Sequence, residues 1–159
     1  MLEGISAIGF ETATPVQEQA IPEIIKRKDV IALAQTGTGK TAAFLLPVIH
    51  NILRSEPDNH IKALVIVPTR ELAVQIDQQM EGLSYCTSLS SIAVYGGGDG
   101  ASFTREKQAL TVGADVIIGT PGRLIAHLIM GYVKVQKLDY LLSLMKQTVC
   151  SIWVSMTIF

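Results

Sequence analysis

The chain has 159 residues, 48% of them hydrophobic and 17% charged, with a net charge of −1. This composition fits one globular domain, excludes a disordered chain, and requires any contact with nucleic acid to be local, because there is no overall basic field. Cys86 and Cys150 have no metal-binding or redox spacing and fit the reducing cytoplasm. No secretory pattern and no apolar stretch of about 18 residues is found, so we expect a cytoplasmic protein without a membrane contact.

The first predicted helix covers residues 15–26. Thr14 is a good N-cap and Pro15 suits the first helical position. Gln17 then lies in the first turn, where its amide offers one acceptor and two donors, which match the edge of an adenine. A solvated glutamine is the alternative when this residue is considered alone.

A glycine-rich loop separates a predicted strand at residues 30–34 from a predicted helix at residues 40–53. The loop and the helix start consist of Ala34, Gln35, Thr36, Gly37, Thr38, Gly39, Lys40 and Thr41. Glycines let the backbone curl so that its N–H groups point at phosphate oxygens, and the helix N-terminus adds its positive dipole end. The sequence therefore predicts a P-loop that binds ATP.

Two side chains of this P-loop carry chemistry. Lys40 is placed to reach the β- and γ-phosphates, and the Thr41 hydroxyl is placed to ligate Mg²⁺. We assign both residues a catalytic role and Thr41 the metal. Ala34 departs from the strict pattern, which has glycine at that position. A simple glycine turn before a buried helix is the structural alternative.

The remaining chain alternates apolar strands with helical patterns. We predict strands at residues 63–67, 92–95, 116–119 and 138–142, and helices at residues 71–83, 103–110 and 123–130. Continuous apolar strands between helices indicate a parallel sheet covered on both faces. Ligands bind such sheets beyond the carboxyl ends of the strands, where the P-loop also lies.

Three further segments, each directly after a predicted strand, are candidate binding sites, and we call them corners. Thr69 caps a helix whose first turn holds Arg70, a combination that can bind a phosphate. Gly97 lies in a glycine run that lets a ligand approach the backbone. Thr120 and Arg123 form a third corner, in which a threonine and an arginine again lie where a helix starts after a strand. Solvated helix ends and a flexible hairpin are the alternatives for these corners.

Taken together, these segments resemble the DEAD-box ATP-dependent RNA helicases, from about Gly9 to Leu142. Residues 9–22 resemble the Q motif, with Gln17 at the position of the adenine-reading glutamine. Residues 34–41 match motif I, including the family's usual alanine. Residues 68–75 match motif Ia, Gly96 and Gly97 match the GG doublet, and residues 120–123 match motif Ib. The stretch 97–124 looks most like bacterial RhlE-type members.

The resemblance implies the first of two RecA-like P-loop NTPase domains, an α/β fold that is incomplete here. It implies ATP and Mg²⁺ as cofactors and a second RecA-like domain, not contained in this sequence, which supplies an arginine finger. It also implies contacts with the RNA sugar–phosphate backbone, independent of base sequence. The residues that would make them are Thr69, Arg70, Gly97, Thr120 and Arg123.

This sequence departs from the family where the Asp-Glu-Ala-Asp motif should follow the predicted strand 138–142. The aromatic residue expected upstream of the Q motif also has no counterpart. We therefore divide the chain into a partial helicase ATP-binding domain at residues 1–142 and an aberrant tail at residues 143–159. The missing carboxylates would hold Mg²⁺ and position the attacking water, so we expect a catalytically incompetent fragment. The alternatives are a nucleotide- or RNA-binding module without turnover, and another P-loop NTPase such as a nucleotide kinase.

We predict that the tail results from a shift of the reading frame near Leu142. When the last base of each codon is joined to the first two of the next, the junction of Met145 with Lys146 must encode Glu, and that of Trp153 with Val154 must encode Gly. The other junctions permit V-L-D-E-A-D-R-M-L-D-M-G-F-Y-D-D-I, a motif II with its following helix. Sequencing the encoding DNA tests this, and codons that cannot spell this peptide in the shifted frame would exclude the hypothesis.

Overall fold

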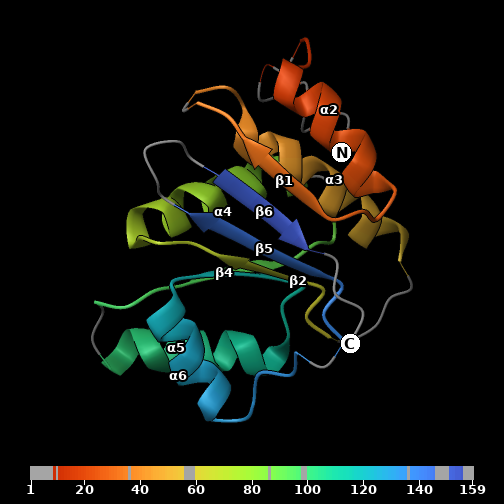
Figure 1. Ribbon diagram of the computed structural model, residues 1–159. Coiled ribbons are helices and arrows are strands. Elements are labelled where there is room, and N and C mark those ends of the chain that lie inside the picture. Colours follow the sequence, from red (N-terminus) through yellow and green to blue (C-terminus); the bar gives the residue numbers. More distant parts are fainter. Residues whose placement is uncertain are drawn as a thin grey trace.

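The computed structural model describes residues 9, 11–35, 37–55, 60–85, 87–97, 100–135, 137–145 and 151–155. Helices and strands alternate along most of the chain (Figure 1). In chain order, the elements are α2 (Pro15–Ile25), β1 (Val30–Leu33), α3 (Lys40–Arg54), β2 (Ala63–Ile66), α4 (Arg70–Ser84), β3 (Ser91–Val94), α5 (Gly100–Val112), β4 (Val116–Gly119), α6 (Pro121–Ile129), β5 (Tyr140–Met145) and β6 (Ser151–Ser155). In this described part, no helix is both long and apolar enough to cross a membrane.

The strands form one sheet in the order β1-β6-β5-β2-β4-β3. The pairs β5–β2, β2–β4 and β4–β3 are parallel. Strand β6 is antiparallel to both β5 and β1, so β1 runs in the same direction as the other four. The predicted α/β fold with a parallel sheet is confirmed, and β6 is an additional strand that the sequence patterns did not indicate.

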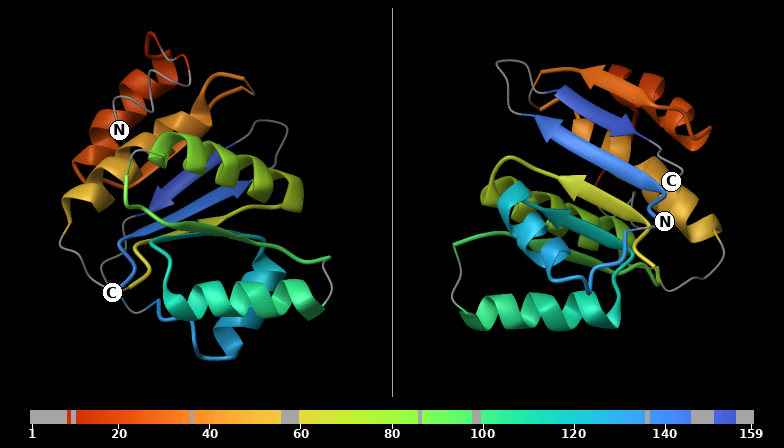
Figure 2. Two further views of the ribbon diagram at one scale, coloured as in Figure 1. Left: turned by 180° about the vertical axis from the view of Figure 1, so that it is seen from behind. Right: turned by 60° about the horizontal axis from the view of Figure 1, so that its bottom comes forward.

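Alternating side chains of the strands build a core on each face of the sheet. Val65 and Ile118 point to the face covered by α2, α3 and α4, where the larger cluster includes Phe44. Leu64 and Ile117 point to the opposite face, which α5 and α6 cover. Figures 1 and 2 show these two helix layers on either side of the strands. Helices therefore cover both faces, as predicted.

The last predicted strand is placed wrongly at both ends. We expected residues 138–142, whereas β5 covers Tyr140–Met145. The reason is a partner that the sequence did not reveal, because residues 141–145 pair with Ser151–Ser155 of β6. The strand therefore continues past residue 142, beyond the point where the family pattern breaks.

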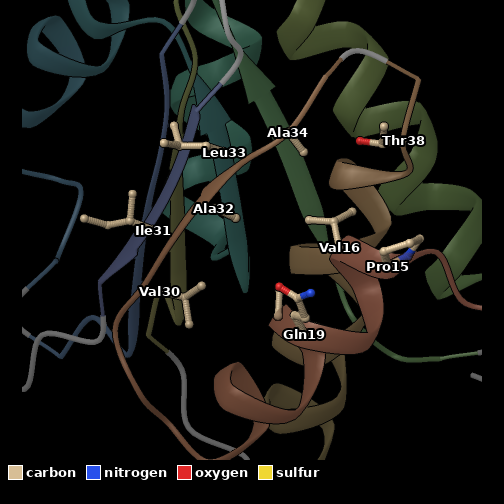
Figure 3. Close-up of a pocket in the computed structure, with 10 residues that line it drawn as sticks. Pro15, Val16, Gln19, Val30, Ile31, Ala32, Leu33, Ala34 and Thr38 are labelled. Atoms are coloured by element: carbon tan, nitrogen blue, oxygen red, sulfur yellow. The ribbon is translucent and has the colours of Figure 1, made fainter.

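Strand β1 is at the edge of the sheet and is covered on one face only. Ile31 and Leu33 are 71% and 69% exposed. Figure 3 shows their side chains pointing away from α2, while Val30, Ala32 and Ala34 point toward it. The second helix layer thus does not extend to this end of the sheet.

Candidate functional site

The P-loop forms a turn that only glycine adopts easily at two positions. Gly37 and Gly39 have φ values of 82° and 78°, in the left-handed region. Gly39 is also the N-cap of α3. The Thr38 hydroxyl donates to the Gln35 carbonyl at 2.8 Å and closes the loop. The N–H groups of the first turn of α3 therefore face an anion-binding concavity at the carboxyl end of β1.

The Lys40 side chain lies inside this loop. Its Nζ donates to the Ala34 carbonyl at 2.6 Å and also to the Gln35 carbonyl. The residue is 8% exposed. An ammonium that is buried against neutral carbonyls is a favourable partner for a phosphate, since an anion would replace weaker dipoles. The loop, the helix start and Lys40 thus fit the phosphates of a nucleotide.

The fit to Mg²⁺ is less complete. Thr41, the second residue of α3, is half-buried and offers one hydroxyl oxygen. In the part of the chain that the structure describes, no group of three or more His, Cys, Asp or Glu side chains could hold a metal ion. Thr36, which we also assigned to the nucleotide, lies outside the described residues.

Gln17 ties the first helix to the P-loop. It is 4% exposed, its Nε2 donates to the Gly39 carbonyl at 3.1 Å, and its Oε1 accepts the Thr14 N–H at 3.0 Å. The Thr14 hydroxyl donates to the Thr38 carbonyl at 2.9 Å. A Cβ on Gly39 would lie only 2.5 Å from Gln17 Nε2. An amide offers two donor hydrogens and two acceptor sites, and these two bonds use one of each.

A cavity of about 410 Å³ lies between α2 and β1. It is lined by Pro15, Val16, Gln19, Ala20, Val30, Ile31, Ala32, Leu33, Ala34 and Thr38. Figure 3 shows Ala34 and Thr38 at the P-loop end of this space and Gln19 at the other. Both apolar and polar atoms line it, a mixture that is common in small-molecule pockets. Gln17 is not one of the lining residues, since its amide is directed at Gly39 and Thr14 instead.

Two of the predicted RNA corners touch each other. The Thr69 hydroxyl accepts the Leu72 N–H at 3.3 Å and caps α4. The side chain of Arg70 is 56% exposed, with Nε 3.8 Å from a carboxylate oxygen of Glu71. Gly97 has a φ of 93°, and a Cβ placed on it would lie 2.5 Å from Arg70 Nη1. The structure therefore places an exposed guanidinium against the backbone of the GG doublet.

The third corner is hydrogen-bonded to the end of β3, but its arginine points toward α5. The Thr120 N–H donates to the Val94 carbonyl at 3.1 Å, and Thr120 is the N-cap of α6. The Arg123 side chain is 14% exposed, with Nε 2.6 Å from Glu106 Oε2. Its guanidinium lies over the Phe103 ring, 4.5 Å from the centroid. Arg123 thus points to α5 and is far less exposed than Arg70.

Sequence reasoning missed the polar cluster that holds Arg123. Glu106 Oε2 is also 2.7 Å from Nε2 of His127, which is 1% exposed. His127 Nδ1 forms a hydrogen bond with the Tyr132 hydroxyl. Burial raises the pKa of Tyr132, and the Glu106 carboxylate raises it further, so the phenol remains a proton donor. The four-residue spacing of Arg123 and His127 places them on one side of α6, but nothing in the sequence pairs them with Glu106.

A strand that leads through a left-handed glycine loop to a helix with a buried lysine defines a P-loop nucleotide-binding domain of the RecA-like type. Comparison with known proteins identifies the family. The DEAD/DEAH box helicase family matches residues 14–146. The chain therefore belongs to the DEAD/DEAH box helicases.

Individual relatives agree with this assignment. The ATP-dependent RNA helicase CshA of Listeria monocytogenes is 44% identical over 128 residues, which cover 80% of this chain and 24% of CshA. The DEAD-box ATP-dependent RNA helicase RhpA of Helicobacter pylori is 46% identical over 129 residues, or 80% of this chain and 25% of RhpA. This chain thus spans about a quarter of the length of the curated relatives it matches.

A solved structure shows the same fold. The crystal structure of a hypothetical ATP-dependent RNA helicase from Sulfolobus tokodaii matches with a TM-score of 0.78 and 28% sequence identity. The match covers 89% of this chain and 39% of that structure. The predicted RecA-like fold is confirmed.

The backbone conformation and close contact of Gly39 lead to a testable prediction, for which Gly122 is the control. Gly39→Ala should destabilise the protein by about 1–2 kcal/mol and weaken ADP binding, because the new Cβ would require a left-handed backbone and would collide with Gln17. Gly122→Ala meets no atom within 4 Å and should leave stability unchanged or raise it by up to about 1 kcal/mol. Urea unfolding and titration with labelled ADP measure both effects. Equal behaviour of the two variants would contradict the P-loop geometry.

Proposed function

We propose that this chain is the ATP- and RNA-binding part of an ATP-dependent RNA helicase. The observation that supports the proposal best is the bonding of Gln17 to the carbonyl of Gly39. With this bond, an amide that could read a base would lie beside a loop that could bind phosphates. ATP would bind with its phosphates on the loop and Lys40, and with Mg²⁺ on the Thr41 hydroxyl.

The same sheet edge would bind the RNA backbone. The loops and helix starts that follow β2, β3 and β4 carry Thr69, Arg70, Gly97, Thr120 and Arg123. Arg70 supplies exposed positive charge, while helix N-termini and hydroxyls supply neutral donors. Because these groups recognise phosphate and sugar, binding would be independent of base sequence.

Turnover is a separate question, and we propose that this chain alone binds without hydrolysis. Residues 141–159 contain no Asp or Glu, so no carboxylate follows β5 where the family carries motif II. We keep the division into a partial domain at residues 1–142 and a frame-shifted tail at residues 143–159. In the family, a second RecA-like domain completes the site. An ATPase assay with and without RNA, beside Lys40→Ala, separates a binding module from an active enzyme.

Base preference tests the nucleotide assignment. The chain should bind labelled ADP more tightly than GDP, and Gln17→Ala should reduce the difference, since the Gln17 amide, held by Thr14 and Gly39, can match the adjacent donor and acceptor on the edge of adenine. Titrations of both nucleotides against both proteins give the four affinities. Equal affinity of the unmodified chain for ADP and GDP would exclude base reading by Gln17.

Salt dependence tests the RNA assignment. Arg70→Ala should weaken binding of a labelled oligo(U) RNA and lower the slope of log K against log salt by roughly one unit, because one phosphate contact is lost. Arg54→Ala, on an exposed residue at the far end of α3, is the matched control. If the two variants bind RNA alike, the motif Ia corner does not contact RNA.

A further inference from the structure

We propose that Glu106 is a positioning residue for RNA binding. Its carboxylate holds Arg123 and His127 together and thereby fixes the first turn of α6, with Thr120 at its start, against α5. The inference rests on the proposed contact between RNA and the α6 corner. It assigns a role to a residue outside all the motifs found in the sequence.

One carboxylate oxygen of Glu106 connects α5 to two side chains of α6. Glu106 Oε2 accepts from Arg123 Nε at 2.6 Å and from His127 Nε2 at 2.7 Å. The Glu106 side chain is 12% exposed and His127 is 1% exposed. Buried polar groups without partners are costly, so the three side chains hold one another in a single arrangement.

The ring of His127 is fixed on three sides. Nε2 donates to Glu106 and Nδ1 bonds to the Tyr132 hydroxyl. The Phe103 ring stacks on it at 4.5 Å with an angle of 10° between the planes. Because Tyr132 can donate to Nδ1, the neutral imidazole satisfies both partners. His127 therefore anchors the carboxylate while Arg123 connects it to the first turn of α6.

Side chains on one side of α5 make the remaining contacts of this cluster. Phe103, Glu106 and Lys107 are three and four residues apart and face the same way on a helix. Phe103 lies under the guanidinium of Arg123, and Lys107 lies 5.5 Å from the centre of the Tyr132 ring. Figure 1 shows α5 and α6 together on one side of the sheet. Since α5 starts close after Gly97, the cluster links the GG corner to the Thr120 corner.

The direction in which RNA affinity changes distinguishes a positioning role of Glu106 from an effect of its charge alone. Removing a carboxylate near an RNA-binding face should tighten RNA binding if only the electrostatic field matters. Positioning predicts the opposite, because Arg123 and the turn that carries it would lose their anchor. Glu106→Ala is therefore expected to bind more weakly even though it makes the protein more positive.

Fluorescence anisotropy with labelled oligo(U) RNA and the full chain tests the proposal. We expect Glu106→Ala to bind about tenfold more weakly. Glu106→Gln keeps an acceptor oxygen for both partners and should bind within about twofold of the unmodified chain. Glu81→Ala, an exposed position on α4, is the control for loss of a negative charge. ADP affinity should be the same for all these proteins.

The outcomes separate this inference from the proposed function. If the unmodified chain does not bind RNA, the proposed function is wrong. If Arg70→Ala weakens binding but Glu106→Ala binds as well as the unmodified chain or better, only the positioning role is wrong. An equal loss in Glu106→Gln and Glu106→Ala also overturns it. Should Glu106→Ala fail to bind ADP, Glu106→Asp replaces it, since its shorter carboxylate cannot reach both partners, and unmodified affinity of that variant would overturn the inference.

Discussion

The left-handed backbone at Gly39 is the constraint on which the nucleotide site depends. A side chain at this position would occupy the space that the Gln17 amide fills, 2.5 Å away. Because Gly39 has no side chain, Gln17 can bond to its carbonyl and Thr14 can bond to that of Thr38. Helix α2, the loop and helix α3 therefore form one unit. A change at Gln17, the proposed base-reading residue, would reach the loop through its hydrogen bond to Gly39.

Features that depend on neighbouring residues could be predicted from the sequence. The P-loop and the Thr69 cap both follow from local chemistry, and the structure contains each of them. Helix α6 was expected at residues 123–130 and starts two residues earlier, at Pro121. The pairing of Glu106 with Arg123 could not be predicted, since it joins two helices with a strand between them. The sequence assigned Arg123 to RNA by motif, and only the fold shows that its guanidinium faces α5.

Strand β6 is the clearest case of a feature beyond sequence patterns. Within the described residues, β1 pairs with β6 and with no other strand, so the tail connects the P-loop strand to the rest of the sheet. The loop also has support from the helices. Asn51 of α3, which is 9% exposed, donates to the Ile24 carbonyl of α2 at 3.2 Å, and the two helices pack closely. Both β1 and the pair of α2 and α3 therefore hold the candidate nucleotide site.

The two arginines of the RNA corners show why geometry matters more than charge on this surface. Arg70 is 56% exposed and can meet a phosphate directly, whereas Arg123 is 14% exposed and already paired. With a net charge of −1, the protein has no general attraction for a polyanion. Binding would then depend on a few donors at helix starts, which are effective only when held at the right distance and angle. Under that condition, a buried carboxylate that fixes one helix start would contribute to RNA binding even though its own charge opposes it.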